Sequence, residues 1–202
     1  MGLFQGSPKQ ILSRLTWELP QTVFGNLASH ASNIGGDVES VDYYDGATVV
    51  RHHSEGWGGF TLGSYINGDN SIRADPNNAL FQHEYGHYLQ SQAHGWFYLG
   101  KDAIPSVLSH DPHNSHPVEQ DANVRAFQYF NEHIPGYNGW KFSRQEGGNP
   151  INDYNPSLGY HDPNNQAALH NRLTLSWYDF ALFPTTPLIH GFINSLILNG
   201  RY

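Results

Sequence analysis

Residues 75–95 read DPNNALFQHEYGHYLQSQAHG, and this stretch decides the fold around it. Asp75 is a residue type that caps helices and Pro76 suits a first helical turn, so the sequence predicts a helix that opens at this pair. Gly95 is the last residue of the stretch and predicts the end of that helix. The glutamines and serine of the segment QSQ make this helix too polar to lie in lipid, which argues against a protease inside a membrane.

The predicted helix carries His83-Glu84-Tyr85-Gly86-His87, an H-E-x-x-H motif. His83 and His87 are about one helical turn apart, so both imidazoles can reach one metal ion. Glu84 lies beside them, where it can hold a metal-bound water and accept its proton. The motif therefore predicts a Zn²⁺ site with His83 and His87 as metal ligands and Glu84 as the catalytic general base.

A third protein ligand would complete the site. A metzincin would place glycine at position 90 and histidine at position 93, where this chain has Gln90 and Ala93. His94 comes one residue late, so that pattern is rejected. The alternative is a glutamate from a following helix, and Glu119 opens a helix predicted from about Pro117 to Ile134.

Glu119 shares one face of this second helix with Ala122, Asn123 and Ala126. The small alanines predict that the two helices approach closely, and Gly86 is interpreted as permitting that approach. Asn123 is one turn on from Glu119 and is expected to hydrogen-bond a ligand histidine. Asp121 points elsewhere on the helical wheel and is the weaker candidate for a ligand.

Other polar side chains leave alternatives open. His110, His113 and His116 are most simply interpreted as part of a solvated loop, and the alternative is that one of them is the third ligand or a donor to the transition state. A donor that steadies an oxyanion is also expected downstream. The spacing does not choose among its candidates, which are Tyr154, Tyr160, His161, His170 and Tyr178.

Several motifs together resemble a known family. They are ADPNNALFQHEYGHYLQSQ, AIPSV, the H-x-V-E-x-D-A-N pattern, a Tyr-Phe pair, LTWELPQTVFGN and GGFTLGSYINGD. The chain resembles the zincin-type metallopeptidase domains attached to bacterial RHS/YD-repeat, polymorphic-toxin-like proteins. The resemblance implies a gluzincin-like site with His83 and His87 as ligands, Glu119 as third ligand and Glu84 as base. Gluzincins usually have an aspartate where Asn123 stands.

Composition excludes several classes. The chain has 202 residues, 10 Lys+Arg against 18 Asp+Glu, a net charge of −8, 13 histidines and no cysteine. Without cysteine there are no disulfides, thiolate zinc sites or cysteine nucleophile. The acidic balance argues against nucleic acid and against an anionic membrane as partners. A surplus of histidine without cysteine favours metal or proton chemistry.

The remaining pattern predicts one α+β domain over residues 1–202, zincin-like and mostly helical, with a small sheet. Its core is expected at about 10–135 and a C-terminal helical part at about 164–200. Residues 9–34 look helical, with Pro20 as a break and an apolar face. A strand over 60–66 is expected at the sheet edge beside the motif helix, followed by an Asn67-Gly68 turn.

Residues 1–20 lack a continuous apolar region and a cleavage site, so no signal peptide is predicted. The apolar stretch over 187–198 is too short for a membrane span and is interpreted as a core helix, although a larger parent protein could be exported. The expected function is a zinc-dependent peptidase that acts on a peptide, a protein or its own parent polypeptide. The alternatives are a zinc-stabilised binding module without turnover and a zinc hydrolase of a non-peptide amide.

Overall fold

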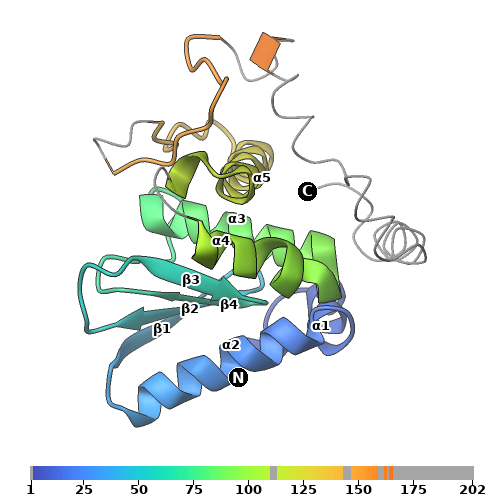
Figure 1. Cartoon of the computed structure of the whole chain (residues 1–202), viewed down its shortest axis with the longest axis vertical. Coiled ribbons are helices and arrows are strands. Elements are labelled where there is room, and N and C mark those ends of the chain that lie inside the picture. Colours follow the sequence, from blue (N-terminus) through green and yellow to red (C-terminus); the bar gives the residue numbers. More distant parts are fainter. Residues whose placement is uncertain (1, 110–112, 143–146, 159–161, 163, 166–202) are drawn as a thin grey trace.

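The computed structural model describes residues 2–109, 113–142, 147–158, 162, 164 and 165. In this part of the chain a mixed sheet lies between helices (Figure 1). Helix α2 (Leu19–Ile34) packs against one face of the sheet and α3 (Ala79–His94) against the other. Helix α5 (Pro117–His133) packs on α3. The expected α+β class is confirmed.

The sheet has the strand order β1-β2-β4-β3. Its strands are β1 (Val38–Tyr44), β2 (Ala47–His52), β3 (Gly59–Leu62) and β4 (Tyr65–Gly68). The β2–β4 pair is parallel and the two outer pairs are antiparallel. Because β3 stands last in the strand order, it is an edge strand. β3 also packs against α3, which places a sheet edge beside the motif helix as the sequence predicted.

The predicted strand over 60–66 is wrong in its extent. It is two strands joined at Gly63 and Ser64, because Gly63 has a φ of 60° that turns the chain. Asn67 and Gly68 do not form the predicted turn but pair with β3 within β4. The turn signal was overridden by sheet pairing, since Asn67 is buried and its side chain accepts a hydrogen bond from Ser29.

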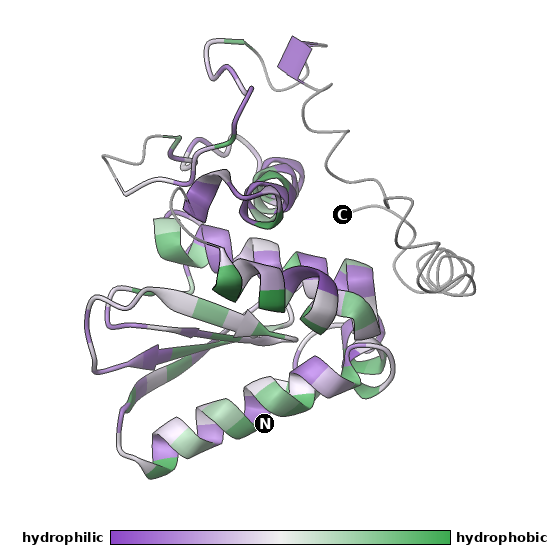
Figure 2. Cartoon of the chain, viewed as in Figure 1, coloured by the Kyte–Doolittle hydropathy of each residue, from purple (hydrophilic) through white to green (hydrophobic). Residues whose placement is uncertain are grey.

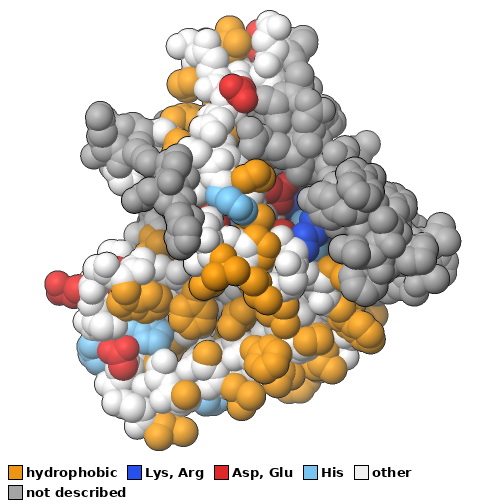
Figure 3. All heavy atoms as spheres, in the orientation of Figure 1, with side chains coloured by type: hydrophobic (Ala, Val, Ile, Leu, Met, Phe, Trp, Pro, Cys, Tyr) orange, Lys and Arg blue, Asp and Glu red, His pale blue; other side chains and the backbone are white. Residues whose placement is uncertain are grey.

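The N-terminal helical region divides near Pro20, as predicted, into α1 (Pro8–Leu15) and α2. The apolar face predicted for this region points mostly outward. Exposed apolar side chains on these helices are Leu12, Leu15, Val23, Leu27 and Ile34. Figure 3 shows hydrophobic side chains gathered over the lower part of this face of the molecule. The buried face is polar or small instead. Arg14 is fully buried and donates to the carbonyl oxygens of Gly2 and Leu3, and Gly25 allows close approach to Tyr65.

Helix α3 begins later than predicted. Asn78 is its N-cap and accepts a hydrogen bond from Phe81 N at 2.9 Å. Asp75 instead accepts from the backbone N of Asn77, which forms a local turn ahead of the helix. The helix ends before Gly95, as expected, and Gly95 has a φ of 54°.

The segment between α3 and α5 is more helical than predicted. It contains η2 (Gly95–Phe97), a π-helical turn η3 (Leu99–Ala103), α4 (Ile104–Leu108) and η4 (His113–Ser115). Pro105 fits the first turn of α4 and therefore does not break it. Trp96 in this segment is 66% exposed, whereas Tyr98 is buried.

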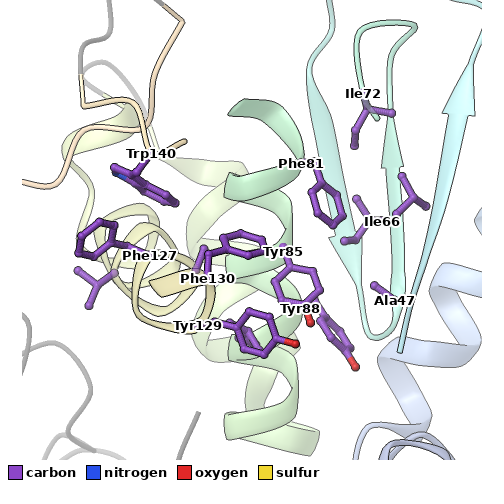
Figure 4. Close-up of a cluster of buried hydrophobic side chains, with 14 of the residues drawn as sticks. Ala47, Ile66, Ile72, Phe81, Tyr85, Tyr88, Phe127, Tyr129, Phe130 and Trp140 are labelled. Carbon is purple, nitrogen blue, oxygen red and sulfur yellow. The ribbon is translucent and has the colours of Figure 1, made fainter. Parts of the chain in front are cut away.

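The core lies between the sheet, α3 and α5 (Figure 4). Aromatic side chains dominate it, and they are Phe81, Tyr85, Tyr88, Phe127, Tyr129, Phe130 and Trp140. Figure 2 shows hydrophobic and hydrophilic residues interspersed along the strands and helices. Gly86 sits where the helices cross, because a Cβ there would lie 2.1 Å from the carbonyl oxygen of Ala122. The prediction that Gly86 permits close helix approach is confirmed.

Residues 147–158 form loops and turns, and Asn164 and Asn165 are helical. Residues 166–200 of the predicted C-terminal helical part, with the core helix over 187–198, lie outside the described residues. Among the described helices, none combines the length and the apolar character needed to cross a membrane.

Candidate metal centre

Three of the predicted site residues converge where α3 crosses the first turn of α5. His83 Nε2 and His87 Nε2 lie 3.0 and 3.1 Å from Glu119 Oε2, and 3.2 Å from each other. Their side chains are 15%, 6% and 0% exposed in the order His83, His87 and Glu119. Glu119 is therefore a buried partner of both histidines and not a surface acid at a helix start.

The partner of the other ring nitrogen fixes the tautomer of His83. His83 Nδ1 lies 2.8 Å from Asn123 Oδ1, as the sequence predicted. Asn123 Nδ2 donates to the carbonyl oxygen of Pro150, so the amide oxygen faces the ring and accepts its Nδ1–H. In the neutral ring, His83 Nε2 then has a lone pair directed at the cluster.

Gln90 does the same for His87. Its Oε1 lies 2.7 Å from His87 Nδ1, and its Nε2 donates to Asp121 Oδ2 and to the carbonyl oxygen of Val118. Because both protons of the amide nitrogen are directed at acceptors, its oxygen must accept the Nδ1–H of His87. Both motif histidines thus have their Nδ1 proton held by an amide oxygen, and in the neutral ring each directs the lone pair of Nε2 at the cluster.

The electrostatics of this cluster favour positive charge. Burial would lower the pKa of His83, but its hydrogen bond to Glu119 and the charges of Glu84 and Glu119 raise that pKa to about 9. The pKa of His87 is raised through the same carboxylate, again against the effect of burial. Burial would raise the pKa of Glu119, but the two histidines hold it well below its ordinary range. Cations, whether protons or a metal ion, are what this site attracts.

The donor set fits a divalent metal ion. Ligand atoms about 2.0–2.1 Å from one Zn²⁺ at tetrahedral angles are roughly 3.3 Å apart, close to the three separations above. Glu119 Oε1 is also buried without a hydrogen-bond partner. A buried carboxylate oxygen left in that state costs free energy, which a bound cation would offset.

Glu84 is buried next to this cluster and is held from the sheet. Its Oε2 accepts a hydrogen bond from Thr61 Oγ1 of the edge strand β3 at 2.8 Å. Gly59 of the same strand leaves room for the carboxylate, since a Cβ there would lie 2.8 Å from Glu84 Oε1. The predicted base thus contacts the sheet edge, one residue along α3 from His83.

His113 joins the cluster, although the sequence favoured a solvated loop for it. Its Nε2 lies 3.6 Å from Glu119 Oε2, and its side chain is 44% exposed. Ligand atoms of His83, His113 and Glu119 all lie within 4.8 Å of one another, an arrangement that could hold a metal ion. The sequence offered one signal for it, the spaced histidines before α5, and left it as an alternative.

Other predicted candidates lie away from the cluster. Asp121 accepts hydrogen bonds from Gln90 and Arg125. These contacts agree with the prediction that Asp121 is a weaker ligand candidate than Glu119. His94, one residue beyond the metzincin position, pairs with Asp102 at 2.5 Å. His116 caps α5.

Of the oxyanion candidates, Tyr154 stacks on Phe142 with ring centroids 4.8 Å apart. The other four, Tyr160, His161, His170 and Tyr178, lie outside the described residues, as does His110.

Comparison with known proteins gives no further lead, because no family model, no curated protein and no solved structure matches the chain.

Proposed function

We propose that this chain is a zinc-dependent metallopeptidase of gluzincin type. His83, His87 and Glu119 would hold the Zn²⁺ and Glu84 would act as general base. The observation that carries the proposal is the convergence of two Nε2 atoms and one carboxylate oxygen within 3.2 Å, with Glu84 buried alongside. An antiparallel edge strand beside the motif helix supports the zincin-like assignment.

Each residue has a distinct task in amide hydrolysis. Zinc, when bound, lowers the pKa of a water molecule and polarises a carbonyl oxygen. Glu84 accepts the proton of the attacking water and passes it to the leaving amine. Thr61 fixes the Glu84 carboxylate while this happens, and Asn123 and Gln90 keep the two imidazoles oriented.

The edge strand supplies a place for an extended substrate. β3 pairs with β4 on one side only, so the backbone groups on its outer side can add a substrate strand. Thr61 on this strand contacts Glu84, which would bring a paired backbone close to the base. A peptide-analogue complex without main-chain pairing to β3 would overturn this part of the proposal.

The substrate class is a peptide or protein. The resemblance to domains attached to RHS/YD-repeat proteins makes the parent polypeptide one candidate, and self-processing would release a fragment that mass spectrometry can identify.

Substitution of the base tests the proposal directly. Glu84→Gln should keep bound zinc and lose hydrolysis of an unfolded protein such as casein, since an amide cannot accept the proton. Glu132→Gln, an exposed residue on α5, is the matched control and should retain activity. Zinc content is measured by elemental analysis alongside each assay. Activity in the Glu84 variant above that of chelator-treated protein would reject the mechanism.

A further inference from the structure

The geometry points to a second role for the cluster residue that the sequence left open: we propose that His113 is an exchangeable fourth ligand of the metal, which closes the site at rest and must withdraw before hydrolysis. The claim that His113 must withdraw before hydrolysis rests on the proposed function. The claim that His113 can bind the metal stands on the side-chain geometry alone.

The first argument is the orientation of the ring. Ser109 Oγ donates its only proton to the carbonyl oxygen of Ser106, 2.6 Å away. Ser109 Oγ is also hydrogen-bonded to His113 Nδ1, so it can only accept there. His113 Nδ1 therefore has the proton, and in the neutral ring Nε2 directs a lone pair at Glu119.

The second argument is convergence. The Nε2 atoms of His83, His87 and His113 lie 3.0, 3.1 and 3.6 Å from the same oxygen, Glu119 Oε2. In the neutral rings, three nitrogen lone pairs directed at one carboxylate repel it and each other, unless a cation, either protons or a metal ion, lies among them. The three nitrogens and Glu119 Oε2 make four donor atoms. Structural zinc sites are closed by four protein ligands, whereas catalytic sites use three.

The third argument is the difference in burial. His113 is 44% exposed, whereas the other ligands are between 0% and 15% exposed. It belongs to the three-residue turn η4, whereas His83 and His87 lie within the 16-residue helix α3 and Glu119 within the 17-residue helix α5. Removal of His113 from the ion thus disturbs little packing, whereas removal of any other ligand would open the α3–α5 interface.

X-ray absorption at the zinc edge tests the coordination. We expect three imidazoles in the zinc-loaded full chain and two in His113→Ala. The Co²⁺-loaded proteins should differ in their visible spectra, and zinc affinity should fall by roughly tenfold or more in the variant. His30→Ala, an exposed residue of α2, is the control and should leave the imidazole number, the spectrum and the affinity unchanged. Two imidazoles in the wild type would overturn the proposal without any need for a variant.

Hydrolysis at saturating zinc tests the exchange. His113→Ala should cleave casein several-fold faster than wild type, because one ligand no longer has to leave. Ser109→Ala, which removes the acceptor of the Nδ1–H, should change rate and affinity in the same direction by a smaller factor. Equal or slower cleavage by His113→Ala would overturn the exchange. Three imidazoles with no hydrolysis by any variant would instead reject the peptidase proposal and leave His113 as a ligand of a closed, structural site.

Discussion

Thr61 Oγ1 lies 2.8 Å from Glu84 Oε2 and 3.1 Å from the Glu84 carbonyl oxygen. The Thr61 hydroxyl thus contacts both the backbone and the carboxylate of Glu84, the residue that the motif predicts to be the base. The backbone at Gly59 is close enough that no side chain fits between strand and carboxylate. Glu84 is therefore positioned by the sheet as well as by its own helix.

Under the proposed mechanism, loss of this hydroxyl should slow turnover. Thr61→Val keeps the shape of the side chain and removes the donor, so the carboxylate loses a fixed orientation; we expect kcat to fall by roughly tenfold, with zinc content unchanged. Thr61→Ser keeps the hydroxyl and should restore most of the rate. Steady-state kinetics measures kcat for both variants. Equal kcat values for Thr61→Ser and Thr61→Val would contradict a positioning role for the hydroxyl.

Gln90 should tune the affinity for metal. Gln90→Leu leaves His87 Nδ1 without its acceptor and Asp121 without one of its donors, so zinc affinity should fall by roughly 10–100-fold. Gln92→Leu is a matched control on the same helix, because Gln92 is also buried but donates to Tyr88 instead. Competition titration with a chromophoric chelator measures both. Equal losses of affinity in the two variants would show a general effect of buried glutamine and not a role for Gln90.

Gly86 should couple stability to the metal site. In Gly86→Ala the new Cβ meets backbone atoms of Ala122, which cannot rotate away, so α3 and α5 must separate. We expect the free energy of unfolding to fall by about 1–3 kcal/mol in chelator. Zinc affinity should fall as well, because α5 carries Glu119. Gly100→Ala, with nothing near its Cβ, is the control and should be close to neutral in denaturant unfolding. A Gly86 variant as stable as this control would contradict the close crossing.

What the sequence could predict is what helical spacing encodes. His83, His87, Glu119 and Asn123 belong to two helices whose periodicity fixes which side chains share a face, and all four lie where the spacing placed them. Thr61 has no such signal. It reaches Glu84 across 23 positions of chain, through a strand pairing that local pattern does not specify.

The errors have physical reasons of the same kind. The apolar face of α1 and α2 is exposed, because the buried face rests on polar contacts such as those of Arg14 with backbone carbonyls, which a hydrophobic pattern does not indicate. His113 belongs to a turn, where no periodicity indicates the direction of a side chain. The split of the 60–66 strand depends on one backbone angle, at Gly63.

Glu18 should make stability fall with pH. Burial, against hydrogen bonds from Ser13 and Ser91, raises the pKa of this carboxyl from 4.5 to about 7. The folded protein therefore retains a proton that the unfolded chain loses above pH 4.5, so the stabilising effect is complete below that pH and is lost as pH rises through about 7. The full difference is on the order of 3 kcal/mol. Glu18→Gln cannot ionise, so its stability relative to wild type should increase by up to that amount between pH 5 and pH 8. Denaturant unfolding of both proteins in chelator measures the difference and removes the contribution of the metal. A constant difference between the two proteins across this pH range would show that Glu18 does not ionise with a raised pKa.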